Sequence, residues 1–391
     1  MDLTDRVVDQ LGDARTRTLG LLEPFDDAEL RRQVSPLMSP LVWDLAHIGH
    51  FEELWLLREL AGAPPTDPRY DDLYDAFKHP RRDRAQLEIL DPDGARTYVA
   101  DVRKRALDHL ATASLDSGDP LLDHAFVYGM IIQHEHQHDE TILATINLME
   151  REHPHPELGV ARSATTTRPD SGASGRFVRV PGGAVTIGSD HPWAYDNERP
   201  VHSTTVAPFR IASSPVTNAE YAAFVDAGGY DDAHAWSAPG WAWRHEDGLE
   251  HPLGWRREGE GTWSRLHFGR RDELAGSEPV QHVCFHEAEA FARWSGARLP
   301  TEAEWEAAAT SGVLDGVGRV WEWTASDFLP YAGFRVFPYA EYSQVFFGDE
   351  HKVLRGGSWA THPVVGRTTF RNWDYPIRRQ IFSGVRLATD G

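Results

Sequence analysis

The sequence contains almost no cysteine: Cys284 is the only one among 391 residues. A single cysteine cannot form a disulfide within the chain, which favours a reducing compartment. It also excludes any mechanism that needs two thiols in one chain. The first residues, MDLTDRVVDQ, lack the basic and apolar regions of a secretory signal peptide. We therefore expect a cytoplasmic protein.

Basic residues are also scarce, because 39 lysines and arginines stand against 60 aspartates and glutamates, a formal net charge of −21. A nucleic-acid surface needs clustered Lys and Arg to neutralise phosphates, and anionic membranes attract the same cations. No run approaches the roughly 18 apolar residues of a membrane-spanning helix. Internal repeats, Walker loops and GxGxxG motifs are missing. We expect small-molecule substrates as partners, with no nucleic acid and no membrane.

Residues 1–152 predict a helical half. Apolar residues at helical spacing between Leu3 and Leu21 indicate a first helix. Ser39 and Pro40 predict the start of a second, with proline at the first helical position, and Gly62 its end. Residues 92–113 and 120–149 give two more. Four helices with one long connection, residues 62–91, predict an up-down four-helix bundle.

The composition changes after residue 152. Residues 153–175 are rich in proline, glycine, serine and threonine without an apolar period, which predicts a linker. Residues 176–391 contain short, glycine-punctuated strand candidates and two helical stretches. The strand candidates are FVRVPGG, AVTIGS, STTVAPFRIAS, KVLRGGSWA and FSGVRLA, and the helical stretches are AEYAAFVDAG and FHEAEAFARWSG. The predicted fold class is therefore α plus α+β, with a helical bundle followed by a compact, loop-rich domain.

The sharpest chemical signal is HEHQH at residues 134–138. On a helix, His134 and His138 project from one face, one turn apart, and continue an apolar stripe, so both should point into the bundle. His136 lies about 200° around the helix and is expected to face solvent. Two inward imidazoles one turn apart suit a divalent metal, although a pair of hydrogen-bonded core histidines has the same pattern.

A third ligand is available on the second helix, where His47 and His50 follow the same apolar stripe. Either could meet His134 and His138 across the bundle. The run also matches the zinc-protease pattern HExxH, with Glu135 as the general base, but such proteases need a further downstream ligand and a cleft. Three neutral nitrogens with open positions suit either zinc or ferrous iron, and spacing does not separate the two.

Several motifs resemble those of the ergothioneine-biosynthetic sulfoxide synthases of the actinobacterial type, over nearly the whole chain. In the helical half these are SPLVWDLAHIGHFEELWLLR and HEHQHDETILATINL, and the resemblance implies a DinB-like four-helix bundle. In the second half VRVPGGAVTIGS, ARLPTEAEWE, VWEWT, LRGGSW and FRNWDYPIRRQ imply a C-type-lectin-like domain of the formylglycine-generating-enzyme type.

The resemblance implies a nonheme iron(II) enzyme that uses O2 to join a cysteine sulfur to carbon 2 of the hercynine imidazole and oxidises that sulfur to a sulfoxide. The implied thiol donor is γ-glutamylcysteine. The implied residues are the iron ligands His47, His134 and His138; the hercynine-binding Gln137, Asn372 and Trp373; the thiol-binding Arg81, Arg84 and Asp374; and the catalytic Tyr339, with Tyr342 as the alternative tyrosine.

Three other functions fit parts of the sequence. A formylglycine-generating enzyme would use a cysteine pair in its second half, which Cys284 alone cannot supply. A lectin-like binding module would leave the histidines of the helical half unexplained. A sister synthase that takes cysteine or a selenosugar stays open, because only ATSGVLDGVGR separates EAEWEAA from VWEWT, where the family has a longer segment. Arg319 also replaces the usual Asn or Asp of that loop, which puts a structural metal there in doubt.

Overall fold

A computed structural model describes residues 2–115, 117–149 and 176–391. The chain divides into two compact units, Met1–Val160 and Ala161–Gly391, here called the helical unit and the second unit. The predicted linker at 153–175 lies outside the described residues, so the predicted domain limits at 152 and 176 stay predictions.

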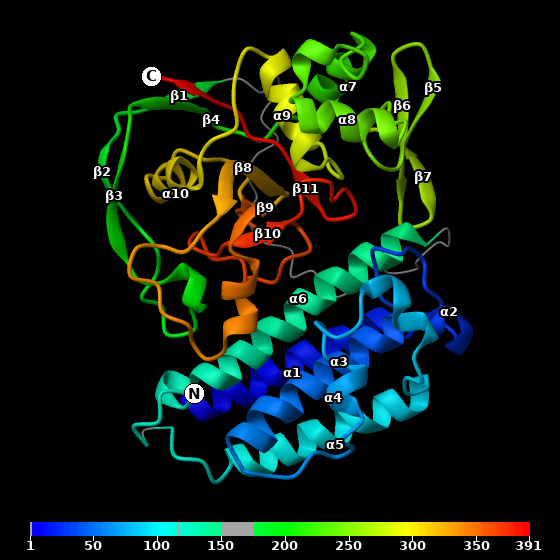
Figure 1. Ribbon diagram of the computed structural model, residues 1–391, viewed down its shortest axis with the longest axis vertical. Helices are drawn as coiled ribbons and strands as arrows, with labels where there is room; N and C mark the ends of the chain where they lie inside the picture. Colours follow the sequence, from blue (N-terminus) through cyan, green and yellow to red (C-terminus); the bar gives the residue numbers. More distant parts are fainter. Residues whose placement is uncertain (1, 116, 150–175) are drawn as a thin grey trace. The chain divides into compact units, whose positions relative to one another are not determined.

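The described part of the helical unit contains four long helical segments, as predicted, and two short helices that the sequence did not suggest (Figure 1). Helix α1 packs against α6, and α3 packs against both α5 and α6. A π-helical segment, Glu53–Glu59, continues α3 directly. The α-helices are α1 (Leu3–Leu22), α2 (Asp27–Arg31), α3 (Leu41–Glu52), α4 (Tyr70–Leu73), α5 (Pro92–Leu110) and α6 (Phe126–Leu148).

Local sequence explains where these helices begin and end. Asp91 caps α5 by accepting from the Gly94 N–H, and proline follows it at the first helical position. Pro40 is the residue before α3 rather than its first residue, and no side chain caps that end. The last helix begins at Phe126, later than predicted, because the two residues before it have positive φ angles that no helix accommodates.

Gly49, in the run AHIG, allows the close approach of α3 to α5. A Cβ atom at this position would lie 2.7 Å from Cγ1 of Val99 and 3.2 Å from the Tyr98 ring. Any larger residue would therefore push α5 away and move α3, the helix that carries His47.

Residues 176–391 of the second unit combine short helices with four small sheets (green to red in Figure 1). Its helices are α7 (Asn218–Asp226), α8 (Ala238–Glu246), α9 (Phe285–Trp294) and α10 (Glu302–Thr310). Its strands are β1 (Phe177–Val180), β2 (Gly183–Ile187), β3 (His202–Val206), β4 (Phe209–Ala212), β5 (Trp255–Gly259), β6 (Thr262–His267), β7 (Arg270–Glu273), β8 (Trp321–Phe328), β9 (Gly348–Arg355), β10 (Asn372–Asp374), β11 (Ser383–Gly384) and β12 (Ala388–Asp390).

The sheet β10-β9-β8-β11 carries the NWD run at its edge. Strand β8 pairs antiparallel with β9 and parallel with β11, and β10 pairs with the outer side of β9. The five strand candidates and two helical stretches from the sequence coincide with observed elements. Helices α8 and α10 and the β5-β6-β7 sheet were not predicted.

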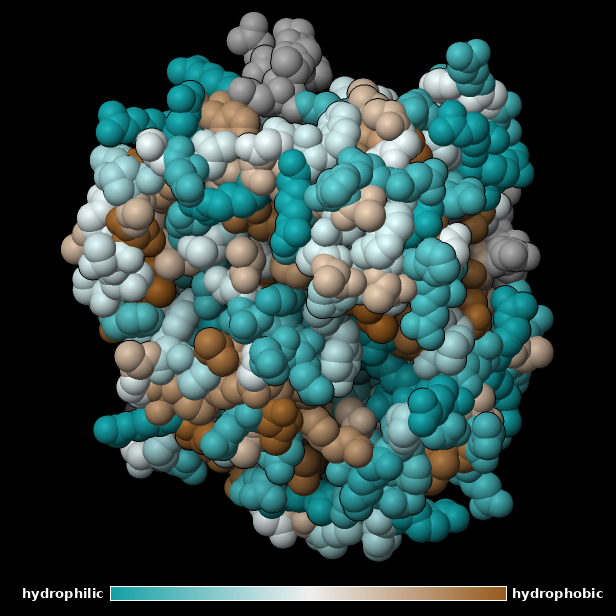
Figure 2. Space-filling model, turned by 45° about the horizontal axis from the view of Figure 1, so that its top comes forward, coloured by the Kyte–Doolittle hydropathy of each residue, from teal (hydrophilic) through white to brown (hydrophobic). Residues whose placement is uncertain are grey.

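The face shown in Figure 2 is mostly hydrophilic, with hydrophobic residues in small, scattered groups. This pattern agrees with a chain in which a quarter of the residues are charged. Within the described ranges, none of the helices has both the length and the apolar character needed to cross a bilayer.

Candidate metal centre

Three histidines from two helices converge in the helical unit. His47 comes from α3, and His134 and His138 come from successive turns of α6. One potential ligand atom from each lies within 4.8 Å of the others. Their ring centroids are 4.6–5.1 Å apart. The structure thus brings together the three residues that the sequence proposed as metal ligands.

In two of these rings, those of His47 and His138, a hydrogen bond determines which nitrogen faces the cluster. The Nδ1 atom of His47 lies 2.7 Å from the carbonyl oxygen of Tyr74, and Nδ1 of His138 lies 3.2 Å from Oδ1 of Asp44. Since both partners accept, each Nδ1 carries the proton and each Nε2 keeps its lone pair. An outer acceptor of this kind accompanies most metal-binding histidines.

Two of the imidazole rings are each stacked against an aromatic side chain. Trp43 stacks on His47 with ring centroids 4.8 Å apart, and Phe51 stacks on His134 at 3.8 Å. The Trp43 indole N–H donates to the Leu73 carbonyl at 2.8 Å, which fixes the indole itself. These contacts limit ring rotation, so the ligand geometry is built before any metal binds.

The electrostatics keep His47 and His134 neutral. Burial lowers the pKa of His47 well below its usual range, and the neighbouring His138 lowers it further. Burial, followed by the two other histidines, does the same to His134. The Nδ1 atom of His134 is buried and has no hydrogen-bond partner among the described residues. Neutral imidazoles with free lone pairs fit a divalent transition metal.

Two nearby histidines do not join the cluster. His50, the alternative ligand on α3, lies with its Nε2 3.0 Å from Asp71, which also receives the Arg58 guanidinium. His136 was expected to face solvent, and that expectation is wrong: it is 2% exposed and its Nδ1 lies 3.1 Å from Oδ2 of Asp139. The far face of α6 is buried as well, because α1 packs against it.

Glu135 is not placed as a zinc-protease base. It is fully buried and accepts hydrogen bonds from Arg15 at 2.7 Å, Arg103 at 2.8 Å and Thr18 at 3.0 Å. Burial would raise its pKa, but the two arginine charges outweigh that effect and lower the pKa to about 2. A carboxylate committed to two guanidinium groups cannot take a proton from water at the metal.

The other predicted residues of the helical unit lie on α6 and in the connection before α5. Gln137 is half-buried, one residue from His138 on α6. Arg81 donates to the Leu37 carbonyl at 3.2 Å. Arg84 is 4% exposed, donates to Ser39 at 2.8 Å, and lies 3.6 Å above the Trp43 ring. Burial and the charge of Arg81 lower its pKa to about 10, so it stays a cation at neutral pH.

Arg84 therefore has a structural contact that the sequence did not predict. Arg84, Trp43 and His47 form a stack in which a guanidinium covers an indole that covers a ligand imidazole. The stacking of Trp43 on His47 and the hydrogen bond between Asp44 and His138 were not predicted. A signal was present: Trp43 and Asp44 stand four and three residues before His47, close to it on a helix.

In the second unit, the predicted aromatic residues belong to one cluster. Trp373 stacks on Phe328 with ring centroids 4.2 Å apart, and Tyr342 meets it edge-on at 5.6 Å. Tyr342 also stacks on Tyr195 at 3.9 Å and lies 6.3 Å from Tyr339. Burial, then the negative charges around it, raises the pKa of Tyr339 well above its usual range, so its hydroxyl keeps its proton.

The polar residues of β10 flank Trp373. The side chain of Asn372 accepts from the Trp373 N–H at 3.0 Å. Asp374 accepts from the Tyr375 N–H at 2.8 Å and from the Arg378 guanidinium at 3.2 Å. These three consecutive residues share the short edge strand, whose side chains are only half-buried.

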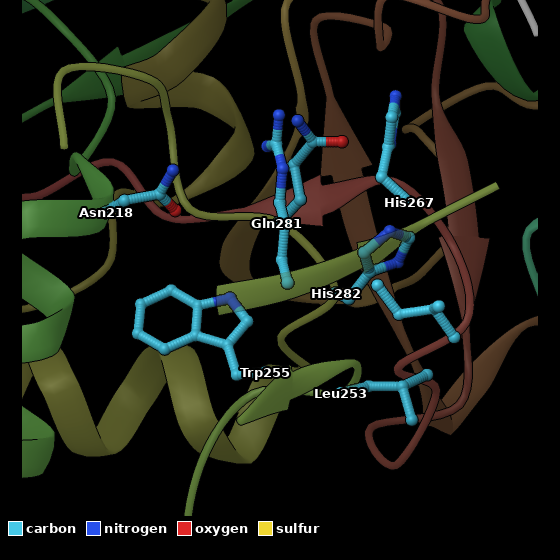
Figure 3. A pocket seen from close by; sticks show the side chains of 8 residues that line it. Asn218, Leu253, Trp255, His267, Gln281 and His282 are labelled. Atoms are coloured by element: carbon cyan, nitrogen blue, oxygen red, sulfur yellow. The ribbon is translucent and has the colours of Figure 1, made fainter. Parts of the chain in front are cut away.

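A small hollow elsewhere in the second unit lies beside His267, Gln281, His282 and Trp255 (Figure 3). Its open space accommodates little more than a water molecule. Burial, followed by charged or ionisable neighbours, lowers the pKa of His267 and of His282 to about 4, so both rings are neutral. No predicted site residue lines it, and we do not assign it to the active site.

Family comparisons agree with this division of the chain. The DinB superfamily matches residues 10–142, and the sulfatase-modifying factor enzyme 1-like domain matches residues 163–314 and 310–391. The fold is thus a DinB-like helical bundle followed by a formylglycine-generating-enzyme-type domain, and the predicted fold class is confirmed. Fold and site together define a two-domain protein with a three-histidine group able to hold a metal.

Full-length relatives give the narrower family. The chain is 46% identical to a hercynine oxygenase of Mycolicibacterium smegmatis, with 99% of each chain covered. It is 44% identical to a hercynine oxygenase of Mycobacterium tuberculosis, with 100% of each covered. A formylglycine-generating enzyme of Streptomyces coelicolor is 39% identical but covers only 37% of this chain and 49% of its own. The chain belongs to the hercynine oxygenases, the sulfoxide synthases of ergothioneine biosynthesis.

The comparison also bears on the short segment between EAEWEAA and VWEWT. The M. smegmatis alignment runs over 441 positions, whereas this chain has 391 residues. At least 50 aligned positions (441 less 391) are therefore unoccupied in this chain, which agrees with a segment shorter than in its relatives.

Proposed function

We propose that this enzyme uses iron(II) and O2 to join the sulfur of γ-glutamylcysteine to carbon 2 of the hercynine imidazole. One S–H and one C–H bond are lost and a C–S bond forms. O2 accepts four electrons in all: one of its oxygens ends on sulfur as the sulfoxide and the other leaves as water. The observation that carries the proposal is the converged group of His47, His134 and His138 in a member of this family.

The donor set supports iron(II). His47, His134 and His138 would hold the ion through neutral imidazoles, which leaves other positions for substrate and oxygen. Bound there, iron would supply the redox chemistry with O2 that no side chain of the protein provides. The second unit's lone thiol, Cys284, is buried, and burial raises its pKa well above its usual range, so it is a poor candidate nucleophile.

We assign the thiol substrate to Arg81, Arg84 and Asp374. γ-Glutamylcysteine carries two carboxylates and an ammonium group, for which guanidinium forks and a carboxylate are suitable partners. Arg81 and Arg84 would bind the carboxylates and Asp374 the ammonium. Arg84 donates to the His79 carbonyl, the Ser39 hydroxyl and the Ala76 carbonyl, and a guanidinium has five N–H groups, which leaves capacity for a further acceptor.

We assign hercynine to Gln137, Asn372 and Trp373. Its trimethylammonium group has no hydrogen to donate, so aromatic faces and carbonyl dipoles are its natural partners. The aromatic cluster around Trp373 offers such faces. Tyr339, protonated because of burial, would deliver a proton or electron during the reaction. With a single cysteine and no need of a disulfide, we place the reaction in the cytoplasm.

A paired substitution tests the metal assignment. His47→Ala should lose stoichiometric iron and sulfoxide formation, whereas His50→Ala should keep both. The two residues are matched controls, since both lie on α3 and are 7% and 6% exposed. Iron content is measured on protein loaded anaerobically, and product by mass spectrometry. Retention of iron and activity in His47→Ala would disprove the ligand assignment.

The sulfur donor is tested separately. Iron-loaded enzyme and hercynine are incubated with γ-glutamylcysteine, cysteine or a selenosugar, and each product is identified by mass. We expect a preference for γ-glutamylcysteine because only that donor presents two carboxylates together with its thiol. Preference for the selenosugar would overturn the donor assignment while leaving the metal centre in place.

A further inference from the structure

Asp44 connects the two helices that supply the metal ligands. It lies in the first turn of α3, three residues before His47, and its carboxylate reaches across to Nδ1 of His138 on α6 at 3.2 Å. Its side chain is only 2% exposed. The same short stretch of α3 therefore provides one ligand directly and supports a second through a hydrogen bond.

The three ligands have different outer partners. His138 donates to the carboxylate of Asp44, His47 donates to the neutral carbonyl of Tyr74, and Nδ1 of His134 has no partner among the described residues. A carboxylate partner holds the proton on Nδ1, keeps Nε2 free, and makes the imidazole a stronger electron donor than a carbonyl partner does. Of the three histidines, His138 is thus the one whose outer partner most increases electron donation to a bound metal.

The carboxylate of Asp44 uses only part of its hydrogen-bonding capacity, which is unfavourable for a purely structural residue. Its Oδ2 is buried without a hydrogen-bond partner among the described residues. By contrast, the buried carboxylate of Glu135 receives two arginines and a threonine. A buried carboxylate with so few donors destabilises the fold unless a positive charge lies close by. The Arg84 guanidinium supplies part of that charge, and a divalent cation on the far side of His138 would add to it.

We propose that Asp44 is a positioning residue for the metal centre: it fixes the Nδ1–H tautomer of His138 and its negative charge strengthens metal binding. The inference rests on the proposed metal site and deepens it. Asp44 itself touches neither the metal nor a substrate in this role, because it acts through the His138 ring.

The test compares Asp44→Asn with Asp71→Asn in the full-length chain. Asp71 is the matched control because it also accepts from a histidine, His50, which lies outside the cluster. Cobalt(II), titrated anaerobically and followed by its visible absorption, should bind Asp44→Asn about 10–100-fold more weakly than the unmodified chain, the usual cost of losing such a partner. Asp71→Asn should bind it with unchanged affinity.

Two further readouts separate positioning from mere stability. In the metal-free chain, nitrogen-15 NMR of His138 should show the proton on Nδ1, and Asp44→Asn should populate both tautomers. Thermal unfolding of metal-free Asp44→Asn should occur at or above the temperature of the unmodified chain, since a poorly satisfied charge is removed.

The outcomes are distinct. Equal cobalt affinity in Asp44→Asn and the unmodified chain would overturn this inference while leaving the metal site standing. Destabilisation of metal-free Asp44→Asn with an unchanged His138 tautomer would also overturn it, since the role would then be structural. Failure of the unmodified chain to bind any metal would overturn the proposed function together with this inference.

Discussion

Substituting Glu135 by glutamine should destabilise the helical bundle strongly without removing a metal ligand. Glu135 and Glu52 are both fully buried and share the guanidinium groups of Arg15 and Arg103. These four residues come from α6, α3, α1 and α5, so a neutral quartet of charges joins the four long helices. Glu135→Gln removes one negative charge and leaves a buried positive charge uncompensated.

The expected cost follows from that imbalance. Breaking a buried ion pair by removing one partner costs about 3–5 kcal/mol. For a unit of this size each kcal/mol corresponds to roughly 2–4 °C in the midpoint, so the helical unit should melt about 6–20 °C lower. The assay is thermal unfolding of the full chain followed by circular dichroism at a helix-sensitive wavelength. Asp108→Asn, which removes only an exposed pair with Lys104, should leave the midpoint unchanged.

The pH dependence provides a second measurement on the same residue. The pKa of Glu135 is about 2 in the folded protein, below the ordinary value of 4.5. A lowered folded-state pKa stabilises the protein above the unfolded-state pKa, and this contribution is lost as the pH falls from about 4.5 toward 2. The stability difference between Glu135→Gln and the unmodified chain should therefore shrink over that window. A pH-independent difference, or a loss below about 1 kcal/mol at neutral pH, would refute the argument.

Three further predictions concern the substrates and the metal. Trp373→Ala should raise the hercynine KM roughly 2–30-fold, the range of a cation–π contact worth about 0.5–2 kcal/mol, and leave the thiol KM nearly unchanged; equal effects on both would argue against a cation-binding role. Tyr339→Phe should bind both substrates but divert the products toward thiol dioxygenation, measured by mass spectrometry, and an unchanged sulfoxide yield would move the role to Tyr342. Removal of metal with a chelator should lower the unfolding midpoint, and added iron(II) should restore it, whereas His138→Ala should show no such response.

Helical periodicity was enough to predict that His134 and His138 share one buried face. His134 and His138 are four residues apart, so a helix must put them on one face, and an apolar stripe showed that this face is buried. Periodicity alone could not decide whether His47 or His50 lies beside His134 and His138. Residues three apart on a helix differ by about 60° in direction, and only the fold shows that His50 turns toward Asp71 in the following connection.

His136 illustrates what periodicity cannot show. Its position opposite the ligand face was predicted correctly, but the prediction assumed that the opposite face meets water. In a bundle where α6 packs against α1 as well as α3, both faces are covered, and a polar residue there is satisfied by a partner distant in sequence or one turn away. The β5-β6-β7 sheet was missed for a related reason: its strands are rich in charged residues and lack an apolar alternation.

The location of all three histidines on α3 and α6 has a consequence for the order in which the enzyme is assembled. The three histidines proposed as ligands all lie within the first 138 residues, in a unit with its own buried core. Domains generally fold as units during synthesis, beginning at the N-terminus. The proposed metal site can therefore form while the ribosome is still translating the remainder of the chain, before the second unit begins to fold.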